Sequence, residues 1–152
     1  MRPDHQGREF HWYLKGYAAM KKNASKDYLV VIESPKHYLS GYNVSIVCNL
    51  RKYFLYDNPV YYFYLKFYVG AYDSSLEWPF SKSVRVTAIH SRDENWTRTR
   101  TFYECLGDFD KLQRPDGNSY RSLAFLNSWS LNDLDMPGFV ENGSLHLSFE
   151  VV

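Results

Sequence analysis

The sequence predicts an all-β domain with the architecture of an eight-stranded antiparallel β-sandwich. Aromatic residues form 18% of the 152-residue chain, with 14 Tyr and 10 Phe among them, and such side chains favour the pleated surface of a sheet. Short segments in which polar and apolar residues alternate recur along the chain, separated by turn residues. Helix-forming segments are few and short. This combination is typical of two antiparallel sheets packed face to face.

Four strands and one short helix are expected in the first half of the chain. The strands are residues 9–14 (EFHWYL), 27–33 (DYLVVIE), 41–50 (GYNVSIVCNL) and 60–69 (VYYFYLKFYV). Residues 17–23 (YAAMKKN) favour one or two helical turns because Ala, Met and Lys are good helix formers. The last of the four strands is bulky on both faces, with Val69 on the side of Phe67, which indicates a central position in a sheet.

The second half repeats this pattern with shorter segments. Residues 83–89 (SVRVTAI) alternate clearly, whereas residues 97–103 alternate between Thr and Arg. Residues 122–126 form a short apolar strand, and residues 131–134 a single helical turn. The chain closes with a strand over residues 143–152, whose Leu and Phe side chains share one face.

Composition limits the domain organisation and the classes of partner. We expect one domain over residues 9–152 after a polar tail at residues 1–8, because this length buries a sizeable core. The net charge is +1, from 18 basic and 17 acidic residues, which gives no electrostatic reason to expect a nucleic acid. No apolar run is long enough to insert into a membrane, and the polar start lacks the apolar stretch of a signal peptide.

The sequence carries no motif for catalysis, a cofactor or a metal. It has neither a glycine-rich phosphate loop nor a G-x-S-x-G nucleophile elbow. Cys48 and Cys105 are expected to be buried free thiols, because two cysteines are too few for a disulfide framework. The five histidines are scattered and none has a metal-ligating neighbour at a useful spacing, and His146 is expected to be a solvated surface residue on the last strand.

Residues 70–80 (GAYDSSLEWPF), followed by the strand after them, resemble the G-x-x-D-x-x-L-x-W-P-F block of MATH domains, the meprin and TRAF homology family. The resemblance runs in order along the chain. Its other matches are FHW at 10–12, ESPKHY at 33–38, GYNV at 41–44, LQRP at 112–115 and FVENGSL at 139–145. It implies an eight-stranded sandwich that binds short peptides and has no catalytic activity.

The resemblance also implies roles for single residues. The tryptophan-proline-phenylalanine corner is structural in the family, so Trp78 and Phe80 are expected in the core, as are Trp12 and Phe139 of the flanking motifs. Large aromatic side chains bury about 150–250 Å² each.

TRAF C-terminal domains are similar to one another in binding receptor tails as an added edge strand over the third-strand face. An arginine and a tyrosine usually help to hold the peptide, and Val47 and Asn49 stand at those positions here. The remaining groove positions carry Leu112, Tyr120 and Ser122. A face of this composition favours apolar anchors over a carboxylate-rich peptide.

Three functional interpretations follow from the resemblance. The first is a cytoplasmic TRAF-type scaffold for receptor tails or adaptor proteins, which would form a homotrimer if a coiled coil precedes it in the full protein, since the chain has no heptad pattern. The second is an extracellular meprin-type domain with a role in folding and assembly; the sequons at Asn23, Asn43, Asn95 and Asn142 favour it. The chain lacks the H-E-x-x-H protease motif. The third is a MATH adaptor that recruits substrates for ubiquitin ligation.

Overall fold

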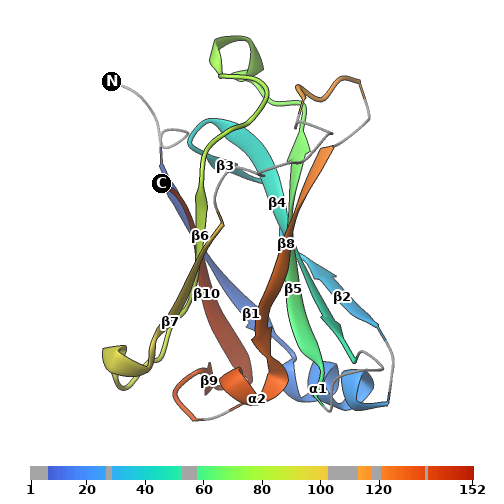
Figure 1. The fold of residues 1–152 in the computed structure, drawn as a ribbon, viewed down its shortest axis with the longest axis vertical. Helices are drawn as coiled ribbons and strands as arrows, with labels where there is room; N and C mark the ends of the chain where they lie inside the picture. The colour runs from blue at the N-terminus through green and yellow to red at the C-terminus, as the bar shows by residue number, and fades with distance from the viewer. Residues whose placement is uncertain (1–6, 27–28, 53–57, 103–112, 118–120, 136) are drawn as a thin grey trace.

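The computed structural model describes residues 7–26, 29–52, 58–102, 113–117, 121–135 and 137–152. Two antiparallel sheets pack face to face, with α1 and α2 at one end of the sandwich (Figure 1). The strands are β1 (Glu9–Lys15), β2 (Val30–Glu33), β3 (His37–Leu39), β4 (Tyr42–Arg51), β5 (Val60–Tyr68), β6 (Val84–Ala88), β7 (Arg98–Phe102), β8 (Arg121–Ser130), β9 (Val140–Glu141) and β10 (Ser144–Val151). The helices are α1 (Tyr17–Ser25) and α2 (Leu131–Leu134), with short 3-10 turns η2 (Asp73–Ser75) and η3 (Glu94–Trp96).

The first sheet has the order β1-β10-β6-β7, and the second has the order β2-β4-β5-β8. Short strands extend each sheet, β9 beside β10 and β3 beside β4. The eight long strands confirm the predicted antiparallel sandwich. Neither β3 nor β9 was predicted, because two or three residues are too few to show an alternating pattern.

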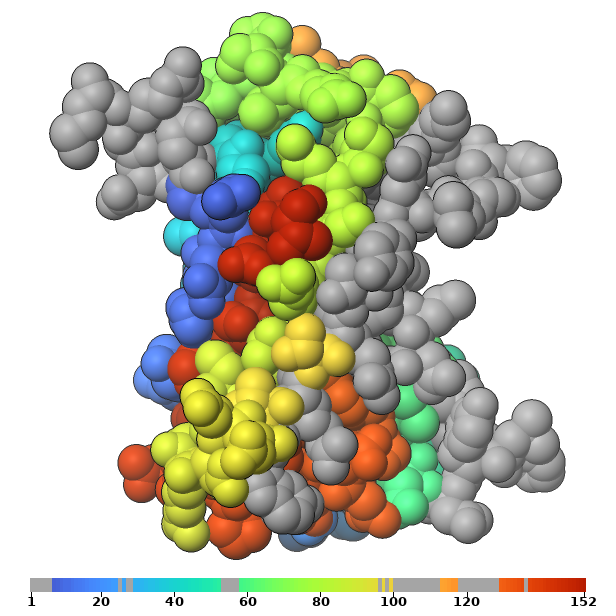
Figure 2. Space-filling model, turned by 60° about the vertical axis from the view of Figure 1, so that its left-hand side comes forward, coloured from blue at the N-terminus to red at the C-terminus, as the bar shows by residue number. Residues whose placement is uncertain are grey.

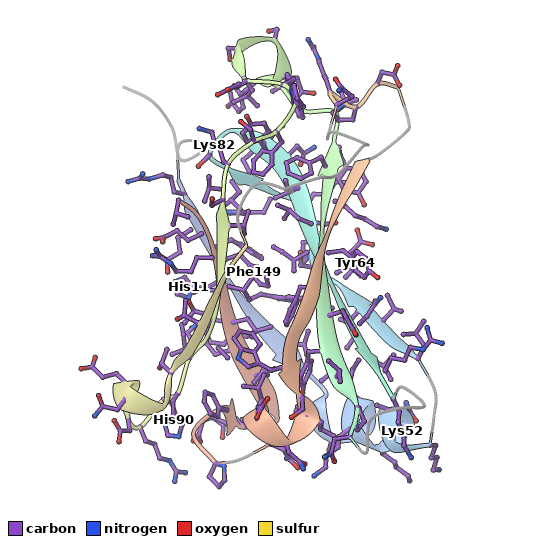
Figure 3. The ribbon with its side chains drawn as sticks, viewed as in Figure 1. His11, Lys52, Tyr64, Lys82, His90 and Phe149 are labelled. Carbon is purple, nitrogen blue, oxygen red and sulfur yellow. The ribbon has the colours of Figure 1, made fainter. Side chains whose placement is uncertain are left out.

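The core lies between the sheets and is built from the alternate residues of each strand. Phe63 of β5 and Phe149 of β10 meet across it, with ring centroids 5.7 Å apart at an interplanar angle of 69°. Figure 3 shows Phe149 directed into the space between the sheets. Burying each such side chain contributes about 1.5–3 kcal/mol relative to leaving it exposed. The expected core face of residues 60–69 is correct for Phe67, but Val69 follows the end of β5 and is 45% exposed.

The two helices close one end of the sandwich. Along α1, Tyr17, Met20 and Ala24 are buried, a helical spacing that turns one face toward the core. In α2 the Ser130 side chain caps the helix by accepting from the Asp133 backbone N–H, and Asp133 caps Ser130 in return. The helical turns expected at residues 17–23 and 131–134 are therefore present, the first extended to Ser25.

Several strand boundaries differ from the expected ones. β8 runs on to Ser130, well beyond the predicted residues 122–126, and its late residue Trp129 is buried. β2 begins at Val30, and β7 spans Arg98–Phe102. Asn127 and Ser128 interrupt the apolar pattern of β8, at a register shift in its pairing with β5, and so hide its length from a pattern search.

The corner that follows β5 packs its aromatic residues against the core. Phe80 is 8% exposed and its ring lies 4.7 Å from that of Phe67. Trp78 is half-buried, and its indole N–H donates a 2.9 Å hydrogen bond to the backbone carbonyl oxygen of Asp73. Trp12 and Phe139, from the flanking motifs, are buried. Cys48 is a buried free thiol, whereas Cys105 lies outside the described residues.

Candidate functional site

The outer face of β4 and β5 is the surface on which the predicted binding residues would lie. Cross-strand pairs place Asn49 opposite Tyr62, Val47 opposite Tyr64, Ser45 opposite Lys66 and Asn43 opposite Tyr68. These side chains point away from the core cluster, and all four on β5 are half-buried. Figure 3 shows Tyr64 on the side of the sheet opposite Phe149. We call this surface the tyrosine face.

Two of the predicted site residues, Val47 and Asn49, lie on the tyrosine face, two positions apart on β4. Val47 is only 5% exposed, so it supports the surface more than it presents itself to a ligand. Asn49 is half-buried, and its Oδ1 atom is buried without a hydrogen-bond partner among the described residues. A buried acceptor of this kind is costly unless a donor reaches it.

The other predicted site residues fall toward β8. The backbone of Ser122 pairs with Lys66, which places Ser122 one strand beyond the tyrosine face. Leu112 and Tyr120 lie outside the described residues. Their assignment to the groove stays a prediction.

A polar cluster that the sequence did not reveal lies at one end of the tyrosine face. Glu33 of β2 accepts hydrogen bonds on Oε2 from the hydroxyls of Ser45 (2.6 Å) and Tyr68 (2.8 Å). Lys66 Nζ lies 3.3 Å from Glu33 Oε1. These residues come from three strands, so no local spacing in the sequence could bring them together.

The hydrogen bonds of this cluster control the charge of Glu33. Partial burial raises the pKa of the Glu33 carboxyl, but the bonds from Ser45, Tyr68 and Lys66 outweigh it and lower the pKa below its ordinary value. Burial, with the neighbouring carboxylate, raises the pKa of the Tyr68 phenol, which therefore stays a neutral donor. Lys36 Nζ lies 4.3 Å from the centroid of the Tyr68 ring, a cation–π contact. The cluster thus balances its negative charge internally.

The edges of the second sheet border the tyrosine face. In the part of the chain that the structure describes, β2 and β8 each have a neighbour on one side only, whereas β4 lies between β5 and the pair β2 and β3. An added strand can therefore pair with β2 or β8 but not with β4. Beside Asn49, the exposed Val31 (53%) carries the apolar surface onto β2.

A family model described as TRAF/meprin, MATH domain matches residues 29–148. The chain belongs to this family. Among solved structures, this MATH domain is similar to TRAF5 of Notothenia coriiceps, with a TM-score of 0.73 and 18% identity over 97% of this chain and 74% of that one. No curated protein sequence matches the chain.

MATH domains are protein-interaction modules, so the partners of this domain are proteins. Within the described ranges, no helix is both long and apolar enough to cross a membrane. The same residues contain no group of three or more His, Cys, Asp or Glu side chains placed to hold a metal ion.

Proposed function

We propose that this MATH domain is a non-catalytic scaffold that binds short, extended peptide segments of receptor or adaptor proteins on the tyrosine face. The observation that carries the proposal is the row of half-buried tyrosines on β5 beside an available sheet edge. In strand addition, main-chain hydrogen bonds supply affinity, while pockets for alternate side chains supply specificity. Tyrosines suit such pockets because they offer a large, rigid contact area with a polar tip.

The peptide would pair with the β8 edge, and its long side chains would meet those of Tyr64 and the other tyrosines on β5. This arrangement uses Ser122 on β8 and keeps Leu112 and Tyr120 as predicted groove residues. The Asn49 Oδ1 atom, buried and without a partner among the described residues, lies one strand from the β2 edge and would accept a hydrogen bond from a peptide that pairs there instead. Val47 replaces a charged side chain of the family, so the preferred anchors are apolar.

A peptide-library selection against the 152-residue chain, followed by affinity measurements on variants, tests this function. Tyr64→Ala removes a central contact and is expected to weaken the selected peptides by about 2 kcal/mol, as at other aromatic hot spots. Tyr13→Ala is the matched control, because Tyr13 is an exposed tyrosine on the opposite sheet. Equal binding by wild type and Tyr64→Ala would exclude the tyrosine face.

One variant at each edge of the second sheet identifies whether the peptide pairs with β8 or with β2. Tyr120→Ala, next to β8, is expected to lower affinity with little change in melting temperature. Val31→Asp alters the far edge at β2 and is expected to leave affinity unchanged. The reverse pattern would place the peptide on β2.

The cytoplasmic TRAF-type role is the first choice, with trimerisation if the full protein supplies a coiled coil. An extracellular meprin-type role is the second candidate, supported by the exposure of three sequon asparagines, Asn23, Asn95 and Asn142. The fourth, Asn43, is half-buried and its amide donates a 2.9 Å hydrogen bond to the carbonyl oxygen of Val69.

Glycan occupancy separates these two roles. Protein secreted from a eukaryotic host that loses no mass on glycosidase treatment would exclude the meprin-type role. A substrate adaptor for ubiquitin ligation would use the same tyrosine face and is distinguished by its captured partners.

A further inference from the structure

Two histidines meet on the outer face of the first sheet, far from the tyrosine face. His11 on β1 and His146 on β10 are 135 residues apart in sequence, yet His11 Nδ1 lies 2.8 Å from His146 Nε2. The strands that carry them lie side by side at the surface, blue and red in Figure 2. Figure 3 shows His11 projecting from β1 away from the core.

The hydrogen bonds around the pair define which nitrogen carries each proton. Glu9 Oε1 lies 2.7 Å from His11 Nε2, and a carboxylate only accepts, so His11 carries its proton on Nε2. When His11 is neutral, its Nδ1 is a lone-pair nitrogen, and His146 Nε2–H donates to it. A single proton is thus shared between the two facing nitrogens.

We propose that His11 and His146 form a binding site for a divalent transition metal ion such as Zn²⁺ or Ni²⁺, which replaces this shared proton. On binding, one coordination bond forms to His11 Nδ1 and one to His146 Nε2, while the Nε2–H bond of His146 breaks and its Nδ1 takes up a proton from solvent, so that both imidazoles stay neutral and no net proton is released. Neutral imidazole is the ligand that these ions take most readily in proteins.

The geometry needs only a small adjustment. Bonds of about 2.0–2.1 Å from the metal to each nitrogen hold two ligand nitrogens about 3.3 Å apart at a tetrahedral angle, compared with 2.8 Å here. A rotation of the exposed His11 ring supplies the difference. Water would fill the remaining coordination positions, because the His11 side chain is 44% exposed.

The surroundings of the pair match those of metal-binding histidines. A carboxylate that accepts from the second ring nitrogen, as Glu9 does from His11, orients the ring and increases its basicity toward a metal. On the other side, the Tyr13 ring stacks on His146 with centroids 4.2 Å apart and an interplanar angle of 18°. The contacts to Glu9 and Tyr13 therefore keep the two facing nitrogens close together before an ion arrives.

A metal ion at this site would link the edge strand β1 to its neighbour β10. In the described part of the first sheet, β1 pairs with β10 and with no other strand. An ion that bridges β1 and β10 binds the folded state alone and so stabilises it by mass action. Sequence spacing gave no reason to expect a metal, since only the antiparallel pairing of the first and last long strands brings these histidines together.

Titration calorimetry with ZnCl₂ on the full chain tests the proposal. Wild type is expected to bind one ion per chain at this site, and to melt at a higher temperature when Zn²⁺ is present. His11→Gln and His146→Gln should each lose this binding and the thermal shift. Glu9→Gln should weaken it about tenfold, the effect typical of a lost outer partner. His37→Gln, on β3, is the matched control and should bind as wild type does.

Ring-nitrogen NMR spectra identify the ligands directly. Zn²⁺ should shift the resonances of His11 Nδ1 and His146 Nε2 and leave those of His37 and His90 in place. Both substituted histidines face outward, so circular dichroism should show an intact fold in each variant. Zn²⁺ affinity in His146→Gln equal to that of wild type, or shifts confined to other histidines, would overturn the proposal.

Discussion

The hydroxyl of Tyr42 donates a 2.8 Å hydrogen bond to the backbone carbonyl oxygen of Glu77. This bond joins the first residue of β4 to the segment that leads into the tryptophan-proline-phenylalanine corner. The Tyr42 ring also meets the rings of Trp78 and Phe80 edge-on, with centroids 5.1 and 5.0 Å away. Tyr42 is therefore, with Phe67, one of the sheet residues that anchor the corner.

Tyr42→Phe should lower the free energy of unfolding by about 1–2 kcal/mol. The substitution keeps the ring contacts but leaves the partly buried carbonyl of Glu77 without its donor, and such an unsatisfied group costs about 1–3 kcal/mol. Urea denaturation measures the loss. Tyr38→Phe, on β3, is a useful comparison because its hydroxyl accepts from the exposed backbone N–H of Ala71, which water can replace. An unchanged midpoint in Tyr42→Phe would show that the bond contributes nothing to stability.

Glu33 should make the stability of the domain depend on pH in the acid range. Its pKa in the folded state lies below the ordinary value of 4.5 that applies to the unfolded chain. The unfolded state therefore takes up the proton first, so the contribution is fully present above pH 4.5 and is lost as the pH falls through the folded-state pKa.

Urea denaturation of wild type and Glu33→Gln between pH 7 and pH 3 measures this contribution. The difference in stability between the two proteins should be largest near neutral pH and should shrink toward the acid end. A difference that stays constant over the whole range would show that the Glu33 carboxylate has no preferential stabilisation in the folded state.

Alternation along single strands could be predicted from the sequence, but contacts between strands could not. The alternation of residues 60–69 predicted that Phe67 lies on the core face of β5, because a strand with one buried face repeats every second residue. It contained no information on which strands pair. The Glu33–Tyr68 bond joins residues of β2 and β5 across β4, and it depends on that pairing.

The family resemblance predicted the tryptophan-proline-phenylalanine corner more completely than the binding face. Trp78 and Phe80 belong to a contiguous motif, so their residue types and spacing can be recognised together in the sequence. The binding face is assembled from several strands, and a substitution such as Val47 changes what the face offers without changing the fold. The exposed fraction of Val47, only 5%, depends on neighbours from another strand and could be learned only from the structure.

Cys48 should be inert to thiol reagents in the folded protein. Its side chain is 1% exposed on β4, and burial raises the pKa of the thiol far above its usual range, which leaves almost no reactive thiolate. In a Cys105→Ser background, a chromogenic disulfide reagent at pH 8 should react at once in denaturant and only at the rate of unfolding in native buffer. Rapid native reaction would show that β4 opens locally to expose the sulfur.

Gly138→Ala should destabilise the domain more than Gly143→Ala, although both glycines have positive φ angles of 100° and 77°. An alanine in this backbone region is strained by about 1–2 kcal/mol at either position. At Gly143 a Cβ atom meets nothing within 4 Å, whereas at Gly138 it overlaps the ring of His90.

The His90 ring cannot easily swing aside. Its Nδ1 accepts hydrogen bonds from the backbone N–H groups of Arg92 (3.2 Å) and Asp93 (3.0 Å), and its ring packs edge-on against Phe139. Gly138→Ala must therefore break these contacts or displace the backbone, and its cost should exceed that of Gly143→Ala by roughly 1–3 kcal/mol, the usual range for overpacking. Thermal and urea unfolding of both variants measure the difference. Equal losses of stability would mean that the His90 ring moves away from the added Cβ atom without an energetic cost.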